Sequence, residues 1–179
     1  MKATGIVRRI DELGRIVVPK EIRRTLRIRE GDPLEIFTDK EGEIILKKYS
    51  SIGEISGFAK QYAENLYQVS GRAALITDRD RFVAATGAYK ILKDQPISKE
   101  LEKVIEGRKC ILAGKGEKAY FAVAPGVTDY TYMAVSPVLC QGDIIGSVIL
   151  LENDENRKMG EVEQKLVLSA ASFIASHME

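Results

Sequence analysis

Basic side chains gather at the start of this chain. Its first 29 residues carry nine lysines and arginines against three acidic residues, a net charge of +6, whereas the whole chain carries only +1. Guanidinium groups bind phosphates through two parallel hydrogen bonds and can also reach guanine edges. A solvated basic face is the plainer interpretation, but charge concentrated in this way favours a polyanionic ligand. The nine basic residues are Lys2, Arg8, Arg9, Arg15, Lys20, Arg23, Arg24, Arg27 and Arg29.

These arginines lie within a pattern of short strands and one helix. Residues 4–10 predict a β-strand, residues 11–14 a turn, and residues 15–18 a second strand that ends at Pro19. Pro19 also suits the first turn of a helix, where its missing N–H costs nothing, and residues 20–28 have helical periodicity. The basic segment is therefore expected to be folded and not a flexible tail.

This arrangement places the arginines on one small module. Arg8 and Arg15 flank the predicted turn, Arg23 and Arg24 lie on the predicted helix, and a predicted hairpin at residues 34–49 completes the unit. About 50 residues bury too little apolar surface to be stable alone, and no disulfide or metal compensates. We therefore expect an obligate dimer with strands of both chains in one core.

The pattern changes after Ser51. A helix is predicted over residues 52–69 because apolar residues follow 3-4 spacing, which is typical of a helix–helix seam. The seam residues are Ile52, Ile55, Ala59, Tyr62, Leu66 and Val69. Further predicted strands are residues 72–77, 82–85, 110–113, 120–124, 130–139 and 143–151, and further predicted helices are residues 96–107 and 159–178. The heptad helix and the last helix are the natural candidates for a second dimer contact through a helical bundle.

Composition bounds the class of protein. With 45% hydrophobic and 30% charged residues the chain is expected to be globular, and no apolar run approaches the about 20 residues that cross a bilayer. The N-terminal residues are not expected to act as a signal peptide, because charged residues stand where its apolar segment would be. Cys110 and Cys140 are 30 residues apart and are expected to be reduced, so the expected setting is cytoplasmic. The expected domains are residues 1–50, a linker at 51–55 that merges into a helix, and residues 56–179.

Residues 3–28, ATGIVRRIDELGRIVVPKEIRRTLRI, strongly resemble AbrB-type swapped-hairpin transcription factors, and residues 34–49 extend the match. The resemblance implies a dimer of interleaved hairpins whose arginines bind double-stranded DNA with weak dependence on sequence. The residues at the family's DNA-contact positions are Arg8, Arg15, Arg23 and Arg24, with Lys2, Arg9, Arg27 and Arg29 in reserve as contributors to the electrostatic field. The alternative is that some of these arginines only pair with Asp11, Glu12 or Glu21.

The remainder of the chain resembles a GAF domain, in its order of helix, antiparallel strands and long closing helix. The fold class expected from both resemblances is α+β: an AbrB-like swapped-hairpin β-barrel dimer followed by a GAF-like antiparallel sheet flanked by helices. The combination resembles a group of sporulation regulators. It implies action in the forespore, as activator and as repressor of late sporulation genes, and assembly into a homotetramer through the GAF helices.

Ligand and enzyme functions have little support in the residues. Residues 151–155 do not reproduce the cyclic-nucleotide motif of some GAF domains, and neither cysteine adjoins a histidine, so no cofactor is expected. An unidentified ligand could be lined by Tyr120, Phe121, Tyr130 and Tyr132. A single histidine, His177, leaves no catalytic triad or metal cluster, and the Gly107-to-Lys115 segment does not match a phosphate loop. The rival class is an antidote-type protein that neutralises a toxin.

Overall fold

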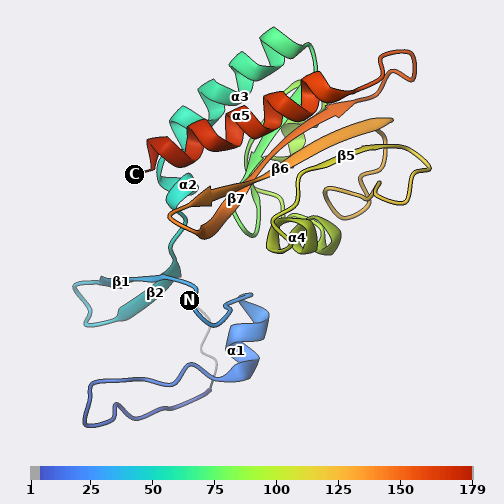
Figure 1. Cartoon of the computed structure of the whole chain (residues 1–179). Coiled ribbons are helices and arrows are strands. Elements are labelled where there is room, and N and C mark those ends of the chain that lie inside the picture. The colour runs from blue at the N-terminus through green and yellow to red at the C-terminus, as the bar shows by residue number, and fades with distance from the viewer. Residues whose placement is uncertain (1–4, 179) are drawn as a thin grey trace. The chain divides into compact units, whose positions relative to one another are not determined.

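A computed structural model describes residues 5–178 (Figure 1). The chain divides into two compact units, Met1–Tyr49 and Ser50–Glu179. The first unit contains α1 (Lys20–Thr25) and a hairpin of β1 (Leu34–Thr38) and β2 (Ile44–Lys48). The two strands pair antiparallel, with Ile36 opposite Leu46. The prediction of a hairpin after the basic helix is confirmed.

Two predicted strands of the first unit are wrong for the single chain. Residues 5–19 run as an extended loop around a turn, with no strand assigned, and Thr4 lies outside the described residues. The predicted helix over residues 20–28 is confirmed but ends at Thr25. A β-branched run becomes a strand only where a neighbouring backbone completes its hydrogen bonds. The turn itself is closed by hydrogen bonds from the Asp11 N–H to the Arg15 carbonyl and from the Gly14 N–H to the Asp11 carbonyl.

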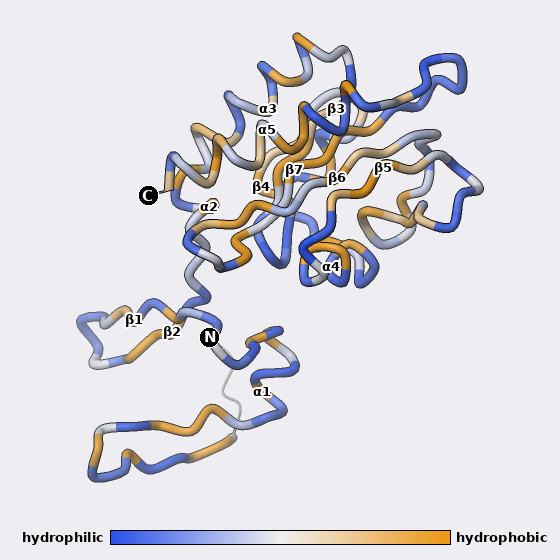
Figure 2. The backbone as a smooth tube through the Cα atoms, viewed as in Figure 1, coloured by the Kyte–Doolittle hydropathy of each residue, from blue (hydrophilic) through white to orange (hydrophobic). Residues whose placement is uncertain are grey.

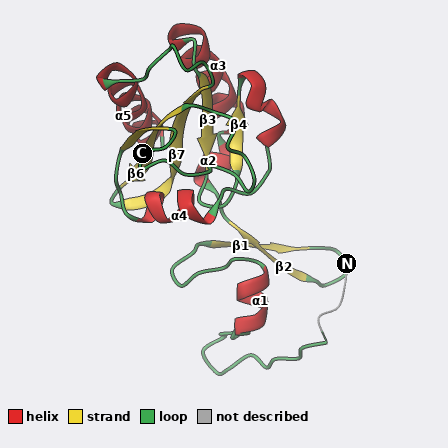
Figure 3. Ribbon diagram, turned by 90° about the vertical axis from the view of Figure 1, so that its right-hand side faces the viewer, coloured by secondary structure: helices red, strands yellow, loops and turns green. Residues whose placement is uncertain are grey.

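The second unit is an antiparallel sheet with helices on both faces (Figures 1 and 3). Its strands occur in the order β4-β3-β7-β6-β5, so that β7 is central. They are β3 (Ala73–Thr77), β4 (Phe82–Ala85), β5 (Ile111–Gly114), β6 (Tyr132–Cys140) and β7 (Asp143–Glu152). The helices are α2 (Ser51–Glu54), α3 (Ser56–Ser70), the 3-10 helix η1 (Gly87–Leu92), α4 (Lys99–Glu106) and α5 (Glu161–His177).

Each face of the sheet carries its own apolar core. In Figure 1, α3 and α5 lie side by side over one face, while α4 lies on the other. Ala59, Leu66 and Ile174 belong to the first core, and Leu75, Leu101 and Tyr130 to the second. Since β7 is covered on both faces, it reads as a nearly continuous apolar run.

Most predicted elements of the second unit are confirmed, with two corrections. The predicted single helix over residues 52–69 is interrupted at Ile55, which separates α2 from α3. The predicted strand at residues 120–124 is wrong. That segment is an irregular loop, because the Val123 N–H bonds the Tyr130 hydroxyl, 3.0 Å away, and not a neighbouring strand. Side-chain bonds of this kind compete with strand ladders, and periodicity does not reveal them.

Candidate nucleic-acid interface

The turn before α1 is organised by one carboxylate. Asp11 Oδ1 accepts hydrogen bonds from the backbone N–H of Leu13 (3.0 Å) and of Arg15 (2.8 Å). Its Oδ2 accepts one from Arg15 Nε at 2.8 Å. Gly14 takes a φ of 75°, which a residue without Cβ adopts freely. Asp11 therefore fixes both the turn and the stem of the Arg15 guanidinium.

The ion pair leaves Arg15 accessible. The Arg15 side chain is 70% exposed, so its Nη groups remain open to solvent. The backbone N–H and the guanidinium of Arg15 lower the pKa of Asp11 below its ordinary value. The alternative that arginines of this segment pair with Asp11 holds for Arg15, yet pairing through Nε is compatible with a second ligand at Nη.

Helix α1 presents the next two arginines to solvent. Arg23 and Arg24 are exposed in its last turn, and neither forms an ion pair or side-chain hydrogen bond within residues 5–178. Cations are favoured at that end of a helix by the partial charges of its free carbonyls. Pro19 precedes the helix and is buried, which fixes where it begins. Both guanidinium groups are thus displayed from a short ordered helix.

The remaining basic residues differ in their surroundings. Arg8 and Arg9 are exposed on the extended loop, and Arg8 Nη1 makes only a long bond of 3.4 Å to the carbonyl of Val7. Arg27 is exposed, Arg29 is half-buried, and Lys2 lies outside the described residues. The structure therefore places all four arginines of the leading set, and three of the four reserve residues, in one unit.

The first unit leaves most of its large apolar side chains in solvent. Val7 is 85% exposed and Val17 is 72% exposed, and Figure 2 shows apolar stretches along the loop before α1. The exposed set is Ile6, Val7, Ile10, Leu13, Ile16, Val17, Leu26, Ile36, Ile44, Leu46 and Tyr49. No large aliphatic or aromatic side chain among residues 5–49 is buried. A patch of this extent marks an interaction surface.

One ion pair of this unit was missed by sequence reasoning. Lys48 Nζ lies 3.2 Å from Asp32 Oδ2, and the Asp32 side chain is only 2% exposed. Lys48 Nζ also donates to the carbonyl of Arg27 at 2.9 Å. The predicted hairpin could have indicated this pair. Its register places Lys48 opposite Leu34, close in sequence to Asp32 in the segment that follows α1.

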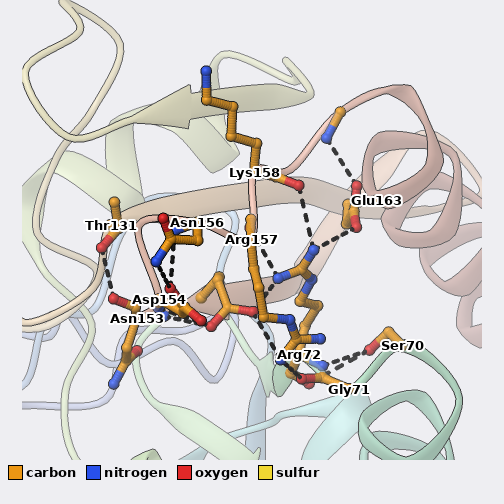
Figure 4. A network of polar contacts seen from close by, with 12 residues as sticks. Ser70, Gly71, Arg72, Thr131, Asn153, Asp154, Asn156, Arg157, Lys158 and Glu163 are labelled. Carbon is orange, nitrogen blue, oxygen red and sulfur yellow. Dashed lines mark hydrogen bonds and ion pairs between the residues drawn. The ribbon is translucent and has the colours of Figure 1, made fainter.

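The second unit contains a buried polar network at the edge of the core (Figure 4). Arg72 Nη1 pairs with Glu152 and donates to the carbonyl of Arg157, and Arg72 Nη2 donates to Glu163 at 3.2 Å. Glu163 in turn accepts the Gly160 N–H at 2.8 Å, which satisfies one free donor at the start of α5. The network therefore joins the residue before β3 to the end of β7 and the first turn of α5.

The carboxylates of this network are held ionised. Burial raises the pKa of Glu152, but the Asp154 N–H and the Arg72 guanidinium outweigh that effect and bring its pKa below the ordinary value. Burial likewise raises the pKa of Glu163, and the Gly160 N–H with Arg72 reverses the shift. Buried charges persist only where partners and hydrogen bonds compensate the loss of water.

Of the four aromatic residues expected around a ligand, three lie together and the fourth lies on the opposite face of the sheet. Tyr130 is buried, and its hydroxyl donates to the carbonyl of Phe121. Tyr120 donates to the carbonyl of Tyr130 at 2.7 Å, so these three residues pack together. Tyr132 packs against the core on the opposite face of the sheet. Burial raises the pKa of Tyr120 and of Tyr130, as expected for core phenols.

A groove of about 380 Å³ lies elsewhere, between β6 and α5. Its lining includes Pro137, Leu139, Leu168 and Ala171, together with Ser136, Ser172 and Ser176. Cys110 and Cys140 are free and half-buried, and burial raises the pKa of Cys110. No helix within residues 5–178 has the length and apolarity that a membrane span requires.

Comparison with known proteins identifies the family. A family model described as "Stage V sporulation protein T C-terminal, transcription factor" matches residues 54–179. Stage V sporulation protein T of Bacillus subtilis is 50% identical over 184 aligned positions, which cover 100% of this chain and 99% of that protein. The chain belongs to the stage V sporulation protein T family. Its membership confirms the expected class, a transcription regulator of sporulation.

Each unit also has relatives of its own. The transition state regulatory protein AbrB of Bacillus subtilis is 67% identical over 49 residues, which cover 27% of this chain and 50% of that protein. A model of the MazE bacterial antitoxin family matches residues 7–54. The GAF domain of an Acinetobacter phosphoenolpyruvate-protein phosphotransferase superposes with a TM-score of 0.59 at 10% identity, covering 74% of this chain and 84% of that domain. The expected fold, an AbrB-like unit followed by a GAF-like unit, is confirmed.

Proposed function

We propose that the first unit binds double-stranded DNA through Arg8, Arg15, Arg23 and Arg24. The observation that carries the proposal is that these four guanidinium groups are exposed on one small unit, Arg8 on the extended loop, Arg15 after the turn and Arg23 and Arg24 on α1, in a chain that belongs to a transcription-factor family. Exposed guanidinium groups on a fixed framework bind phosphates and fix the position of a protein on the duplex. Sequence dependence would then come mainly from the deformability of the DNA.

The binding unit acts as a homodimer. The large apolar side chains of residues 5–49 are not buried within one chain, and no strand is assigned in residues 5–19. A second copy would supply both the missing ladder and the missing core, which is the usual solution for a domain of this size. Two copies of the basic surface would meet DNA segments about one helical turn apart.

The test of DNA binding is its dependence on salt. Binding of promoter DNA is measured at several salt concentrations for the wild-type chain, for Arg15→Ala and for Arg23→Ala. Loss of a phosphate contact weakens binding on all sequences and lowers the slope of log K against log salt by about 1. Lys60→Ala, an exposed change on α3 of the second unit, is the control and should alter neither quantity. Unchanged affinity in both arginine variants, with no salt slope in the wild type, would reject the proposal.

The second unit would join two dimers into a homotetramer through α3 and α5. Four aromatic rings support this contact, because Phe58, Tyr62, Phe173 and His177 stack across these two helices while Phe173 stays 48% exposed. The regulator would act in the cytoplasm of the forespore, as activator at some late sporulation genes and as repressor at others. Transcript profiles of a deletion strain test this dual role: transcripts of activated genes should fall, and transcripts of repressed genes should rise.

An antidote-type function is the second candidate, because the MazE antitoxin model matches residues 7–54. The full-length match to a sporulation regulator favours DNA as the partner. Native mass spectrometry of protein captured by the tagged chain separates the two: a stoichiometric toxin-like partner would support the antidote function. An unidentified ligand of the second unit is tested by thermal melting with a metabolite panel, since a ligand of the folded state raises stability.

A further inference from the structure

Arg27 occupies a backbone conformation that arginine rarely adopts. Its φ is 53°, in the left-handed region. The N–H of Ile28 bonds the carbonyl of Arg23 at 2.7 Å, and the N–H of Arg27 bonds the carbonyl of Arg24 at 3.3 Å. This pair of bonds is the Schellman motif that ends a helix, and Arg27 stands at its left-handed position, where glycine is favoured. An arginine there is strained by its own Cβ.

Two further residues hold this strained position. Lys48 Nζ donates to the carbonyl of Arg27 at 2.9 Å and pairs with Asp32 Oδ2 at 3.2 Å. Asp32 Oδ2 also accepts the N–H of Arg29 at 2.8 Å. Since the Asp32 side chain is 2% exposed, this pair is shielded from solvent. The carbonyl at the end of α1 is thereby tied to the last residue of β2.

The Arg27 side chain makes no contact that would stabilise the fold among the described residues. It is exposed, and it makes no hydrogen bond or ion pair among the residues that the structure describes. Glycine would keep every backbone bond of the motif and remove the strain. A strained residue that the surrounding structure holds in place is a sign of function when its side chain serves no packing role.

We propose that Arg27 is a further phosphate-contacting residue of the DNA interface, and that Asp32 and Lys48 are its positioning residues. The proposal rests on the proposed DNA-binding function and adds to it, since Arg27 stands only as a reserve contributor of charge in the sequence. Arg27 follows Arg23 and Arg24 at the end of α1, so the three guanidinium groups would bind neighbouring phosphates of the DNA backbone. The contact would be with phosphate, because a positioned guanidinium matches its oxygens in pairs.

The decisive variant is Arg27→Gly in the full-length chain, assayed on promoter DNA. Affinity should fall roughly tenfold, equally on specific and unrelated sequences, and the salt slope should fall by about 1 for each arginine lost. The thermal midpoint should stay equal to the wild type or rise, because glycine accepts this conformation without strain. A residue with a merely structural role would not give weaker binding together with undiminished stability.

Arg108→Gly is the matched control. Arg108 has a φ of 54°, the same conformation in the second unit, and its guanidinium donates to the carbonyl of Gly142 at 2.7 Å. Its replacement should leave DNA affinity and the salt slope unchanged.

Asp32→Asn tests the positioning residues through the sign of its effect. Removing a negative charge near the interface would tighten DNA binding if only the field mattered. Loss of the hold on Lys48 should weaken binding instead, while far-ultraviolet circular dichroism stays that of the wild type. Tighter binding by this variant would overturn the positioning role.

The inference can fail independently of the proposed function. Unchanged affinity and slope in Arg27→Gly, together with weakened binding in Arg15→Ala, would overturn the role of Arg27 and leave DNA binding by the other arginines in place. A lowered thermal midpoint in Arg27→Gly would overturn the strain argument. Absence of any salt slope in the wild type would reject the proposed function itself.

Discussion

Asp11 shows how an acidic residue serves a basic surface. Its two carboxylate oxygens accept hydrogen bonds from the turn and from Arg15 Nε, and the Arg15 side chain remains largely exposed. Asp11 lowers the net positive charge of the segment, but it also holds Arg15 in place, and a guanidinium that is already fixed loses less conformational entropy when it binds. The net charge of the basic segment therefore understates how well it is arranged for phosphate.

The pKa of Asp11 gives the first prediction. The Arg15 N–H and the Arg15 guanidinium lower this pKa below 3.8. In Arg15→Ala the pKa should rise only part of the way to 3.8, because the larger cause, the backbone N–H, remains. NMR titration of the Asp11 carboxyl carbon measures both values. A carboxyl whose pKa is lower in the folded state than in the unfolded state stabilises the fold at pH values above its unfolded-state pKa. This stabilisation is lost as the pH falls through its folded-state pKa.

Arg9→Ala is the control for that titration. Arg9 is exposed and forms no hydrogen bond or ion pair with Asp11, so its removal should leave the pKa of Asp11 almost unchanged. An equal rise in both variants would show that general field, and not the specific bonds of Arg15, holds the carboxyl ionised.

At this scale the sequence could predict which residue types gather, and only in part what each does. The arginines flanking the turn follow from local spacing, and the turn itself is confirmed. The Asp32–Lys48 pair and the left-handed Arg27 could not be read from spacing, because they depend on where β2 returns past the end of α1. Local periodicity carries no information on such contacts.

Strand β7 owes its place to a glycine. A Cβ on Gly146 would lie 1.9 Å from the carbonyl oxygen of Thr77 in β3, a distance that no real contact allows. Gly146→Ala should therefore force the two central strands apart and lower the free energy of unfolding by about 3 kcal/mol. Urea unfolding followed by near-ultraviolet circular dichroism measures the loss.

The same substitution elsewhere should act in the opposite direction. Gly57 lies in α3 and has no heavy atom within 4 Å of the position that a Cβ would take. Gly57→Ala should raise the free energy of unfolding by about 1 kcal/mol, because alanine has the higher helix propensity. Equal effects from the two alanines would contradict the steric account of Gly146.

The Arg72 network predicts a second stability effect at the scale of elements. Arg72→Met would take the cation away from Glu163 and leave Glu152 with only the half-exposed Arg157, which should cost about 3–5 kcal/mol at pH 7. Arg157→Met is the control, because the Arg157 side chain is 47% exposed and its pair with Glu152 should contribute less than about 1 kcal/mol. Equilibrium unfolding in urea compares the two variants.

At acidic pH, the difference in the free energy of unfolding between Arg72→Met and the wild type should become smaller. Glu152 and Glu163 have lowered pKa values in the folded wild type, so their stabilising contribution is present above the unfolded values and is lost as pH falls through the folded ones. Once protonated, both carboxyls tolerate burial without a cation, because burial penalises only the charged form. A gap that stayed constant between pH 7 and pH 3 would contradict an electrostatic origin.

Elements with a periodic core were predictable, and elements that depend on non-local partners were not. The antiparallel strands β6 and β7 and the long helix α5 were predicted from their long apolar segments, and the structure has all three. The strand at residues 120–124 failed because Tyr130 competes for its backbone. For the runs predicted at residues 4–10 and 15–18, no strand is assigned in residues 5–19, because a strand also needs a neighbouring backbone that completes its ladder, and local sequence does not supply one.

The apolar residues of the heptad pattern at residues 52–69 mostly pack into the core of the second unit and are not left on its surface. Ile52, Ala59 and Leu66 are buried against their own sheet, whereas Val69 is 81% exposed. The exposed seam lies instead across α3 and α5, where the ring of Phe173 lies 5.2 Å from that of Tyr62. Aromatic residues placed in this way are typical of protein–protein contacts.

Assembly of the whole molecule is therefore the last prediction. In solution the full-length chain should have four times its mass of 19.9 kDa, and residues 1–53 alone should form a dimer. Phe173→Asp should yield the dimer, because a carboxylate buried between copies would have no partner. Ile91→Asp, at an 83% exposed position of η1, should stay tetrameric. Light scattering gives the masses, and a tetrameric Phe173→Asp chain would remove α5 from the contact while leaving the dimer of the first unit intact.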